Sequence, residues 1–555
     1  MECSPPSRYR SGQTRRPRWR DPRKKRCQLA SPPLLPTTPP SRPSSFASIT
    51  GPSSPIKASA VPSGLKSKIN FTCLRSVKKL KRKNWRVVGR RCCHYVGRFC
   101  VIRSYSATSA ASPSQPAATT NMGSTLDAAA PGPFKVLVIG GSYGGLAAAL
   151  NLSDLCLGKP ARGDLRERNE ENANKNDPEP FDVDITMVDE RDGFYHVIGS
   201  PLVFASSTYA EKAWIPYKDI PALQTTPNIR PPVRGSVVRV DLESKTAEIR
   251  PASGNSKPHT LAYDILVVAA GLRRAFPVVP QALERATYLS EVAPHIQAVT
   301  HAPDGVLVVG GGAVGVEMAA ELKLAQPQTK VTLAHSRARL LSSEPLPDTV
   351  ASQALALLQK GGVDVLLDHR LETTRLLSND GDGNGNGNSS GDTPVHEVTF
   401  TNGHTLRTNA VVRAMSQSVP STQFLPPAAL DAAGYLRIRP NLFFPADVPH
   451  ADSALGVGDL VAWSGIKRCG GAMHHGALAA WNVHQRMRQL RHGTAPVFQA
   501  LEKTPPMIAL ALGKEALAFG GEDGVKTGTD IAEHFFQDDV GLNSEKPKGG
   551  DMDKI

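Results

Sequence analysis

The chain has 555 residues and a formal net charge of +15, but its basic residues are concentrated at one end. Residues 1–121 hold 25 Lys and Arg against two acidic residues, whereas the rest of the chain holds 40 basic and 48 acidic residues, a net charge of −8. This length predicts two or three domains with a large core, and the acidic balance beyond residue 121 argues against a folded part that binds nucleic acid.

The basic N-terminal segment is predicted to be a disordered extension over residues 1–132. It is rich in Pro, Ser, Arg and Lys and shows no sustained apolar period. Three interpretations stay open. It could be an organelle-targeting segment, although its early prolines oppose an amphipathic helix, or a nucleic-acid-binding or nuclear-import arm. The third is an upstream extension of a protein whose translation starts at Met122.

Cysteine usage predicts a reducing compartment. Only Cys156 and Cys469 lie outside the N-terminal segment, so no disulfide framework is indicated. No apolar run reaches the ~18 residues of a membrane-spanning helix. The expected location is the cytoplasm, with peripheral contact to a membrane as an addition and the mitochondrion as the alternative.

The first chemical motif is a strand followed by a glycine turn and a helix. The apolar run from Val136 to Gly140 is continuous and not alternating, which predicts a buried parallel strand. Such a turn offers free backbone N–H groups and the positive end of a helix dipole to a pyrophosphate. Ser142 stands where the G-x-G-x-x-G pattern has its middle glycine, and a turn that binds nothing is the alternative. The predicted cofactor-binding residues here are Gly140, Gly141, Ser142, Tyr143, Gly144 and Gly145.

A second strand, residues 181–189, ends in an acidic residue. Asp189 lies farther from the glycines than the usual ~20 residues because a charged insert, residues 159–180, intervenes. Its carboxylate is predicted to accept hydrogen bonds from an adenosine ribose. Glu190 is the less favoured candidate, and a strand-end acid without a ligand is the alternative.

Two further stretches complete the first nucleotide site. Val237 lies in a short β-rich stretch, residues 234–240, that could return beside the adenine. A buried strand that begins near Tyr263 ends in a turn of small residues, where Ala270 and Gly271 permit close approach of the backbone to a cofactor.

A second strand–glycine–helix unit covers residues 305–317. It matches G-x-G-x-x-G without a departure, at Gly310, Gly312 and Gly315. Its second strand, residues 330–334, is followed by His-Ser-Arg337 and carries no acid at its end. Because a ribose-binding carboxylate would repel a 2′-phosphate, this site accepts NADPH and leaves NADH open. Residues 379–392 form a low-complexity loop.

The last chemical motif is an apolar strand that ends in Gly458-Asp459. Its carboxylate is predicted to bind a ribityl hydroxyl, and a helix expected from about Ala472 would place its N-terminus near a flavin ring. The adjacent His474 and His475 point about 100° apart on a helix, so they predict solvated or cavity-lining side chains and no metal site.

The order of these motifs resembles the pyridine-nucleotide oxidoreductase superfamily of flavoproteins with two dinucleotide-binding domains, over about residues 133–540. The chain is most similar to the apoptosis-inducing-factor-2-like (ferroptosis-suppressor) flavoproteins and the type II NADH dehydrogenases. The similarity rests on Val188-Asp-Glu-Arg-Asp-Gly-Phe194 and on the helix Gly315-Val-Glu-Met-Ala-Ala-Glu321. Ser142, and Leu202 where a basic flavin contact is expected, depart from the pattern and predict a less tightly held flavin.

The resemblance implies an α/β fold with two Rossmann-like domains and the cofactors FAD and NAD(P)H. The FAD-binding domain would be discontinuous, residues 133–302 and 431–490, with the NAD(P)-binding domain, residues 303–430, inserted and a C-terminal α+β region, residues 491–555. Glu317 resembles the glutamate that meets the nicotinamide carboxamide and the flavin edge, so it is the predicted catalytic residue. Glu321 is predicted to be structural.

The resemblance also bears on the electron acceptor. Many superfamily members pass electrons through a C-x₄-C pair, but here Cys156 and Cys469 have no partner nearby in the sequence. Electrons are therefore expected to pass from flavin directly to a diffusible acceptor, which the resemblance makes a quinone. The alternatives are a reductase of a small protein electron carrier and a cell-death effector that uses the flavin fold as a binding scaffold. The apolar stretch at residues 504–513 could lie against a membrane or subunit, or form a core strand.

Overall fold

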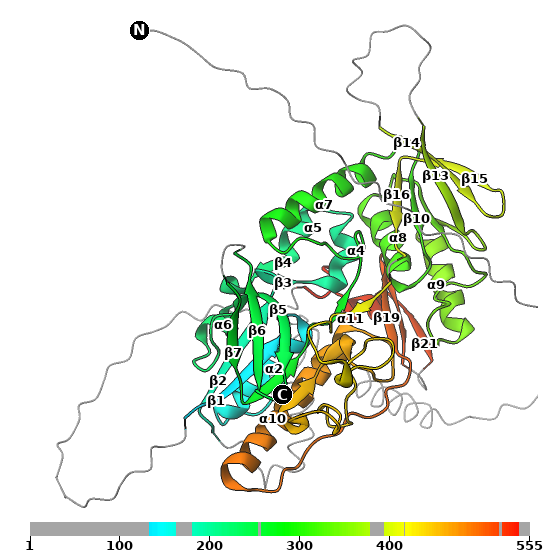
Figure 1. The fold of residues 1–555 in the computed structure, drawn as a ribbon. Helices are drawn as coiled ribbons and strands as arrows, with labels where there is room; N and C mark the ends of the chain where they lie inside the picture. Colours follow the sequence, from blue (N-terminus) through cyan, green and yellow to red (C-terminus); the bar gives the residue numbers. More distant parts are fainter. Residues whose placement is uncertain are drawn as a thin grey trace, which may run out of the picture. The chain divides into compact units, whose positions relative to one another are not determined.

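The computed structural model describes residues 132–162, 180–253, 257–377, 393–415, 417–520 and 524–542, all within one compact unit, residues 71–555 (Figure 1). The predicted N-terminal extension up to residue 131, most of the charged insert and the low-complexity loop lie outside the described residues.

The first sheet has the strand order β18-β8-β1-β2-β5-β6-β7. Pairing is parallel from β18 through β5 and antiparallel between β5, β6 and β7. The strand β18 comes from residues 454–456, so a late segment of the chain completes the sheet that the early segment begins. The bounds are β1 Phe134–Ile139, β2 Val183–Asp189, β5 Val233–Asp241, β6 Thr246–Pro251, β7 His259–Ala262, β8 Ile265–Val268 and β18 Ala454–Gly456.

The second sheet is parallel, with the strand order β12-β11-β10-β16. Its strands are short, and β10 and β11 are buried throughout, as expected for a parallel sheet with both faces covered. The bounds are β10 Val306–Val309, β11 Val331–Ala334, β12 Val363–Leu366 and β16 Ala410–Arg413.

Smaller sheets surround these two. Antiparallel sheets are formed by β13 Leu371–Leu377, β14 Val395–Phe400 and β15 Thr405–Thr408, and by β19 Ile508–Leu512, β20 Glu515–Phe519 and β21 Val525–Gly528. The strand pairs are β3 Gly193–Tyr195 with β4 Trp214–Pro216, and β9 Leu272–Arg273 with β17 Val419–Pro420. The sheet β19–β21 is called here the C-terminal sheet. Residues 508–512 of the apolar stretch at 504–513 form its mostly buried strand β19.

The α-helices are α2 Tyr143–Cys156, α4 Ser200–Val203, α5 Ser207–Lys212, α6 Pro221–Thr225, α7 Arg285–Thr300, α8 Ala313–Ala325, α9 Asp348–Lys360, α10 Cys469–His492 and α11 Thr529–Phe535. Short 3₁₀ helices cover Val197–Gly199, Tyr217–Asp219, Pro427–Ala429, Ala451–Ser453 and Gly458–Leu460. Among these described helices, none combines the length and the apolar composition needed to cross a bilayer.

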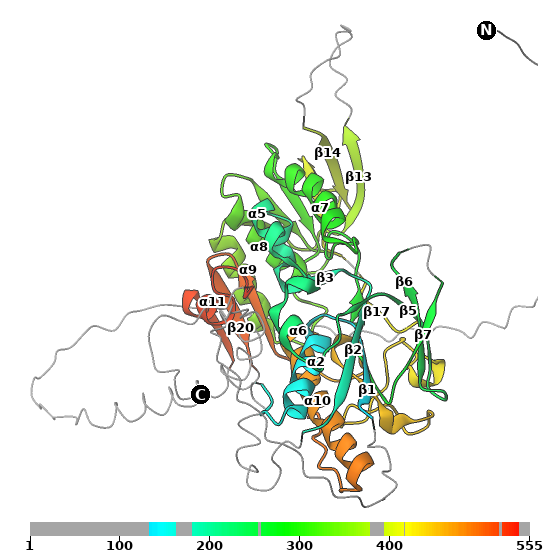
Figure 2. The same cartoon turned by 90° about the vertical axis from the view of Figure 1, so that its left-hand side faces the viewer.

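The helices α2 and α10 pack closely against each other. Figures 1 and 2 both show them side by side, with α2 against β1 and β2. A glycine makes this crossing possible, because a Cβ atom on Gly476 would lie 2.4 Å from the Gly144 carbonyl oxygen. The close packing brings the N-terminus of α2, which comes early in the chain, next to the N-terminal part of α10, which comes late.

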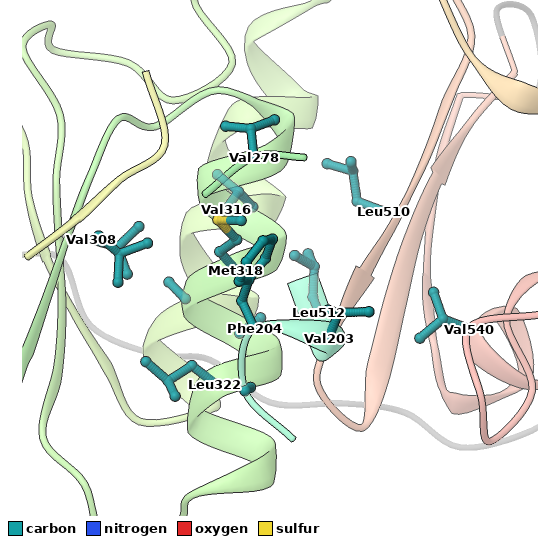
Figure 3. Packing of buried hydrophobic residues seen from close by; sticks show 14 of the residues in the cluster. Val203, Phe204, Val278, Val308, Val316, Met318, Leu322, Leu510, Leu512 and Val540 are labelled. Atoms are coloured by element: carbon teal, nitrogen blue, oxygen red, sulfur yellow. The ribbon is translucent and has the colours of Figure 1, made fainter. Parts of the chain in front are cut away.

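The helix α8 packs between the second sheet and the C-terminal sheet. Figure 3 shows Val316, Met318 and Leu322 of α8 between Val308 of β10 and Leu510 and Leu512 of β19. All of these side chains are buried in one apolar cluster. The C-terminal sheet is therefore held directly on the helix that follows the second glycine turn.

Two predicted boundaries shift for local reasons. The strand β1 ends at Ile139 and not at Gly140, because Gly140 has a φ of +104° and leaves the extended conformation. The helix α10 begins at Cys469, three residues before the predicted start, and includes Gly470 and Gly471, which have low helix propensity.

Candidate active site

A cavity of about 1460 Å³ lies where the carboxyl ends of parallel strands from both large sheets meet the N-termini of α2, α8 and α10. Its volume exceeds the ~300–1,000 Å³ of an ordinary ligand pocket, which suits two nucleotides bound end to end. The predicted site residues that line it are Gly140, Ser142, Tyr143, Gly144, Asp189, Val237, Ala270, Gly271, Gly310, Gly312, Glu317, Gly458 and Asp459.

Three glycines predicted to bind a cofactor do not line the cavity. A Cβ atom on Gly145 would lie 1.7 Å from the Gly140 carbonyl oxygen, and one on Gly315 would lie 1.8 Å from the Gly310 carbonyl oxygen. A Cβ atom on Gly141 would lie 2.3 Å from the Tyr217 hydroxyl. These positions are glycine because helix, strand and neighbouring ring pack too closely for a side chain, which is a packing role and not a direct contact with the cavity.

Ser142 fits the first turn without strain. Its φ of −97° and ψ of −158° are ordinary extended values, and it forms the N-cap of α2 without a side-chain cap hydrogen bond. Gly312, the matching residue of the second turn, has a φ of −78°, and a Cβ atom there would meet nothing within 4 Å. The middle position of this turn therefore needs no glycine conformation, and the departure at Ser142 leaves the backbone of the turn intact.

Asp189 ends β2 at the cavity wall. Its Oδ2 accepts a hydrogen bond from the Gly141 N–H at 2.6 Å, and its Oδ1 accepts one from the Arg191 N–H at 2.8 Å. Burial raises the pKa of this carboxyl, and the two N–H donors oppose that effect. Each oxygen keeps a lone pair for a ribose hydroxyl. Glu190 is held instead by Arg273, whose Nη2 donates to its Oε2 at 2.6 Å.

The second glycine turn is built like the first. Gly310 has a φ of +119°, and Gly312 is the N-cap of α8 without a side-chain cap. The Gly311 N–H donates over 3.1 Å to Nδ1 of His335, the residue that directly follows the strand β11. His335, Ser336 and Arg337 all line the cavity, as do the two helix N-termini that carry no acid in the first turn.

The turn at Gly458-Asp459 is fixed by groups that the sequence did not predict. The Gly458 N–H donates to Nδ1 of His475 at 3.2 Å, and burial lowers the pKa of His475 to about 3, so this imidazole is neutral. Asp459 Oδ2 lies 3.9 Å from Nη2 of Arg274. Burial raises the pKa of Asp459, and the charges of Arg274 and Lys467 oppose that effect. The prediction for His475, a solvated or lining side chain, missed this contact with the backbone.

Glu317 and Glu321 lie one turn apart on α8, and each accepts a backbone N–H from the C-terminal sheet or its first turn. Ala511 donates to Glu317 Oε1 at 3.0 Å, and Gly513 donates to Glu321 Oε1 at 3.3 Å. Burial raises the pKa of Glu317 to about 8 and that of Glu321 to about 7. Glu317 is half-buried because it faces the cavity, whereas Glu321 is 3% exposed.

His196 is a second residue whose role the sequence did not indicate. It is 1% exposed, and burial lowers its pKa to about 4. In the neutral ring, Nε2–H donates to the Val540 carbonyl at 3.1 Å, and Nδ1 accepts a hydrogen bond from the Tyr143 hydroxyl, also at 3.1 Å. The first helix and the C-terminal segment are thereby joined. Only the tertiary structure shows this contact, because the partners lie 53 and 344 residues away.

The C-terminal sheet and the segment after it add mainly apolar side chains to the cavity lining. The sheet contributes Leu510 and Phe519 together with one cation, Lys526, and the following segment contributes Phe535 and Phe536. Ile466, just before α10, also lines the cavity, next to Lys467 and Arg468. The cavity thus combines polar turns suited to nucleotides with an aromatic and aliphatic wall suited to an apolar molecule.

The described cysteines do not form a redox pair. Cys156 and Cys469 are both free, and burial raises the pKa of each thiol to about 12, which disfavours the reactive thiolate. Cys469 lines the cavity at the start of α10, whereas Cys156 is buried at the end of α2. Within the described ranges, no three His, Cys, Asp or Glu side chains are grouped to hold a metal ion.

The residues at the turns fit dinucleotides. The N-termini of α2 and α8 face the cavity with uncapped N–H groups, which suit pyrophosphates. The strand-end Asp189 can accept a ribose hydroxyl. In addition, the buried Nε of Arg191, a residue of the same wall, has no hydrogen-bond partner among the described residues and can donate to a bound group.

Comparison with known proteins agrees with this geometry. A family model described as pyridine nucleotide-disulphide oxidoreductase matches residues 134–433. Oxidoreductase OXR1 of Ajellomyces capsulatus is 46% identical over 424 residues, 76% of this chain and 89% of that protein. Ferroptosis suppressor protein 1 of Mus musculus is 28% identical over 43% of this chain and 54% of that protein. The crystal structure of reduced Bacillus anthracis CoADR-RHD aligns with a TM-score of 0.49 at 18% identity, over 71% of this chain and 62% of that chain.

The family match covers more than half of the 555 residues, and the alignment with OXR1 covers most of both chains. The α/β fold with two Rossmann-like domains, the family resemblance and the cofactors FAD and NAD(P)H are thereby confirmed. The roles of single residues and the exact domain boundaries stay predictions. The chain belongs to the pyridine nucleotide-disulphide oxidoreductase family and is an oxidoreductase that uses FAD and NAD(P)H.

Proposed function

We propose that the protein passes electrons from NAD(P)H through FAD directly to a quinone-type acceptor, without a redox-active disulfide. The observation that carries this proposal is the composition of the cavity. Its lining combines two glycine turns suited to nucleotides with mainly apolar side chains of the C-terminal sheet and the segment after it, and the described lining has a single, unpaired cysteine.

We assign FAD to the first sheet and NAD(P)H to the second. In this assignment the FAD-binding domain covers residues 133–302 and 431–490, the NAD(P)-binding domain residues 303–430, and the C-terminal region residues 491–555. The turns at 140–145 and 310–315 bind the pyrophosphates. Asp189 binds the adenosine ribose, Val237 lies beside the adenine, and Ala270 with Gly271 lets the backbone approach. Asp459 binds the ribityl chain.

FAD, when bound, supplies the redox chemistry, because it accepts a hydride and releases electrons to a second molecule. The protein contributes position and electrostatics. The N-termini of α2 and α8 bind phosphate charge, and the N-terminus of α10 faces the cavity beside Asp459. The neutral His475 holds the Gly458 N–H and so fixes the direction of the neighbouring Asp459.

Glu317 is the proposed catalytic residue. Its carboxyl lines the cavity, accepts the Ala511 N–H and has a pKa of about 8, so it holds a proton at neutral pH. Reduction of a quinone to a hydroquinone consumes two protons. A protonated carboxyl at the cavity wall can donate one of them, and a pKa close to the working pH is the most effective for this task.

The apolar wall supports an acceptor with an apolar ring or chain. Partly buried aromatic rings at Phe519, Phe535 and Phe536 offer an apolar surface, which favours such a molecule over a hydrated one. The two described thiols, with pKa values raised to about 12, favour transfer that bypasses cysteine.

The test is oxidation of the NAD(P)H-reduced holoenzyme by a panel of acceptors under anaerobic conditions. A short-chain ubiquinone analogue should reoxidise it faster than a ferredoxin-type iron–sulfur protein. Phe519→Ala should raise the KM for the quinone about five- to thirtyfold, since it removes roughly 1–2 kcal/mol of apolar contact. Phe498→Ala, which packs on Phe443 outside the cavity, is the matched control.

Two results would replace the proposal. Faster oxidation by the iron–sulfur protein would make the enzyme a reductase of a small protein carrier. Failure of every acceptor, with FAD bound and reduced, would favour a binding scaffold such as a cell-death effector. For location we propose the cytoplasm, with peripheral membrane contact as the source of an apolar quinone and the mitochondrion as the alternative.

A further inference from the structure

Both glycine turns are held by a hydrogen bond from a glycine N–H to the side chain at the end of the second strand, but the accepting group differs between them. In the first unit the N–H of the second glycine, Gly141, donates to the carboxylate of Asp189, which ends the second strand. In the second unit the N–H of the second glycine, Gly311, donates to the imidazole of His335, which follows the second strand. Asp189 and His335 therefore occupy equivalent places, but one carries a carboxylate and the other an imidazole.

His335 is held as a neutral ring. Because Nδ1 accepts the Gly311 N–H, the ring proton must lie on Nε2, from which it is donated to the Ser342 Oγ at 3.0 Å. The side chain is 9% exposed. Burial lowers its pKa, and the nearby charge of Arg337 lowers it further, whereas a hydrogen bond to the Arg339 backbone and the charge of Asp368 oppose this shift. The strand end that binds a ribose in the first unit thus carries no negative charge in the second unit.

Cations face the same part of the cavity. Nη1 of Arg337 donates to the Ser342 carbonyl at 3.1 Å and to its Oγ at 3.2 Å, so Arg337 and His335 meet at one serine. Arg370, an exposed residue after β12, also lines the cavity, and its neighbour His369 donates its backbone N–H to the His335 carbonyl at 2.8 Å. Two carboxyls oppose these cations: Glu344 also lines the cavity, with a pKa that burial raises, and Asp368 lies close enough to His335 to raise the pKa of that imidazole.

We propose that the second nucleotide site selects NADPH over NADH, with Arg337 and Arg370 binding the 2′-phosphate beside His335. A carboxylate at His335 would bind two ribose hydroxyls and repel a phosphate, whereas two guanidinium groups bind a phosphate through charge-assisted hydrogen bonds. This inference rests on the proposed placement of NAD(P)H at residues 310–315. It does not depend on the identity of the electron acceptor.

Binding of nucleotide fragments to the oxidised holoenzyme tests the inference without any turnover. Isothermal titration should show that adenosine 2′,5′-bisphosphate binds at least tenfold more tightly than adenosine 5′-monophosphate. Arg337→Ala and Arg370→Ala should each reduce this ratio about tenfold or more, since each removes a charge-assisted contact. Arg407→Ala, an exposed arginine of β15 outside the cavity lining, should leave the ratio unchanged.

The rate of flavin reduction, measured anaerobically with no acceptor present, gives the second readout. NADPH should reduce the wild-type flavin with a higher kcat/KM than NADH, and His335→Asp should reverse the preference. A wild-type protein that binds the two fragments equally and is reduced equally by both coenzymes overturns the inference. If NADH and NADPH reduce the flavin equally and quinone then reoxidises it rapidly, only this inference is overturned. If NADPH is preferred but quinone does not reoxidise the flavin, only the proposed function is overturned.

Discussion

Replacing Glu317 by glutamine should slow electron delivery to the acceptor far more than it slows flavin reduction by NAD(P)H. With a pKa of about 8, the carboxyl is protonated in about nine of ten molecules at pH 7. Glutamine is also neutral and can still accept the Ala511 N–H, so the nucleotide site should keep its charge and shape. What glutamine lacks is a proton that it can donate.

The size of the effect follows from the position of the carboxyl. General acids contribute about 10²–10⁴ in rate, and water that enters a cavity of this size can replace part of that contribution. We therefore expect acceptor reduction to fall by roughly 10- to 100-fold at pH 7, with flavin reduction within about twofold of wild type. In the wild type, acceptor reduction should also fall as the pH rises through about 8, because the carboxyl loses its proton there.

Stopped-flow absorbance separates the two steps, since flavin bleaching follows the first and its recovery follows the second. Glu372→Gln, on an exposed position of β13, is the matched control. If Glu317→Gln slows flavin reduction and acceptor reduction equally, Glu317 would instead have the role predicted from the sequence, a contact to the nicotinamide. An unchanged pH profile in both steps would show that Glu317 holds no proton used in the reaction.

Two further predictions concern binding and stability. Asp459→Asn should weaken FAD binding by about 10- to 100-fold, because it removes the charge of a half-buried hydrogen-bond acceptor worth roughly 1–3 kcal/mol. Fluorescence titration of the apoprotein measures this change, and Asp447→Asn, at an exposed position, should leave the FAD affinity unchanged. Glu321→Gln should make the protein more resistant to urea at pH 8 than at pH 5, relative to wild type. The folded-state pKa of Glu321, about 7, lies above its unfolded value of 4.5, so the wild type loses stability as the pH rises through this interval, up to about 3 kcal/mol. A variant that gains nothing at pH 8 would show that Glu321 ionises freely.

The glycine turns could be predicted from the sequence because their chemistry is local. A positive φ at Gly140 and Gly310, and the absence of room at Gly145 and Gly315, require glycine at those positions whatever the rest of the chain does. The same requirement explains why the pattern alone did not separate glycines that line the cavity from those that pack behind it. A glycine that lines the cavity leaves space for a bound group, whereas a glycine behind the cavity leaves space for neighbouring protein atoms, and the sequence pattern is the same for both.

The electrostatics of the site could not be predicted because they depend on distant partners. The pKa of Glu317 is raised by burial in a cavity wall whose other side, β19, comes almost 200 residues later in the chain. His475 accepts a hydrogen bond from the Gly458 N–H, and this contact depends on where α10 begins. The glycines at 470 and 471 have low helix propensity, so the sequence did not predict the start of α10 correctly. The contact between His335 and the second glycine turn could have been predicted from the sequence. His335 follows the second strand of its unit at the position where Asp189 ends the second strand of the first unit.

Transfer of electrons from NAD(P)H through FAD without a second redox centre is tested most directly by an anaerobic reductive titration of the holoenzyme. If FAD is the only centre that accepts electrons, the flavin should bleach completely with about one equivalent of coenzyme per FAD, and added quinone should restore the oxidised spectrum. Cys469→Ser should give the same stoichiometry. Consumption of about two equivalents of coenzyme per FAD, lowered to one by Cys469→Ser, would contradict direct transfer from FAD to the acceptor, because it would show that a cysteine-based centre also takes up electrons.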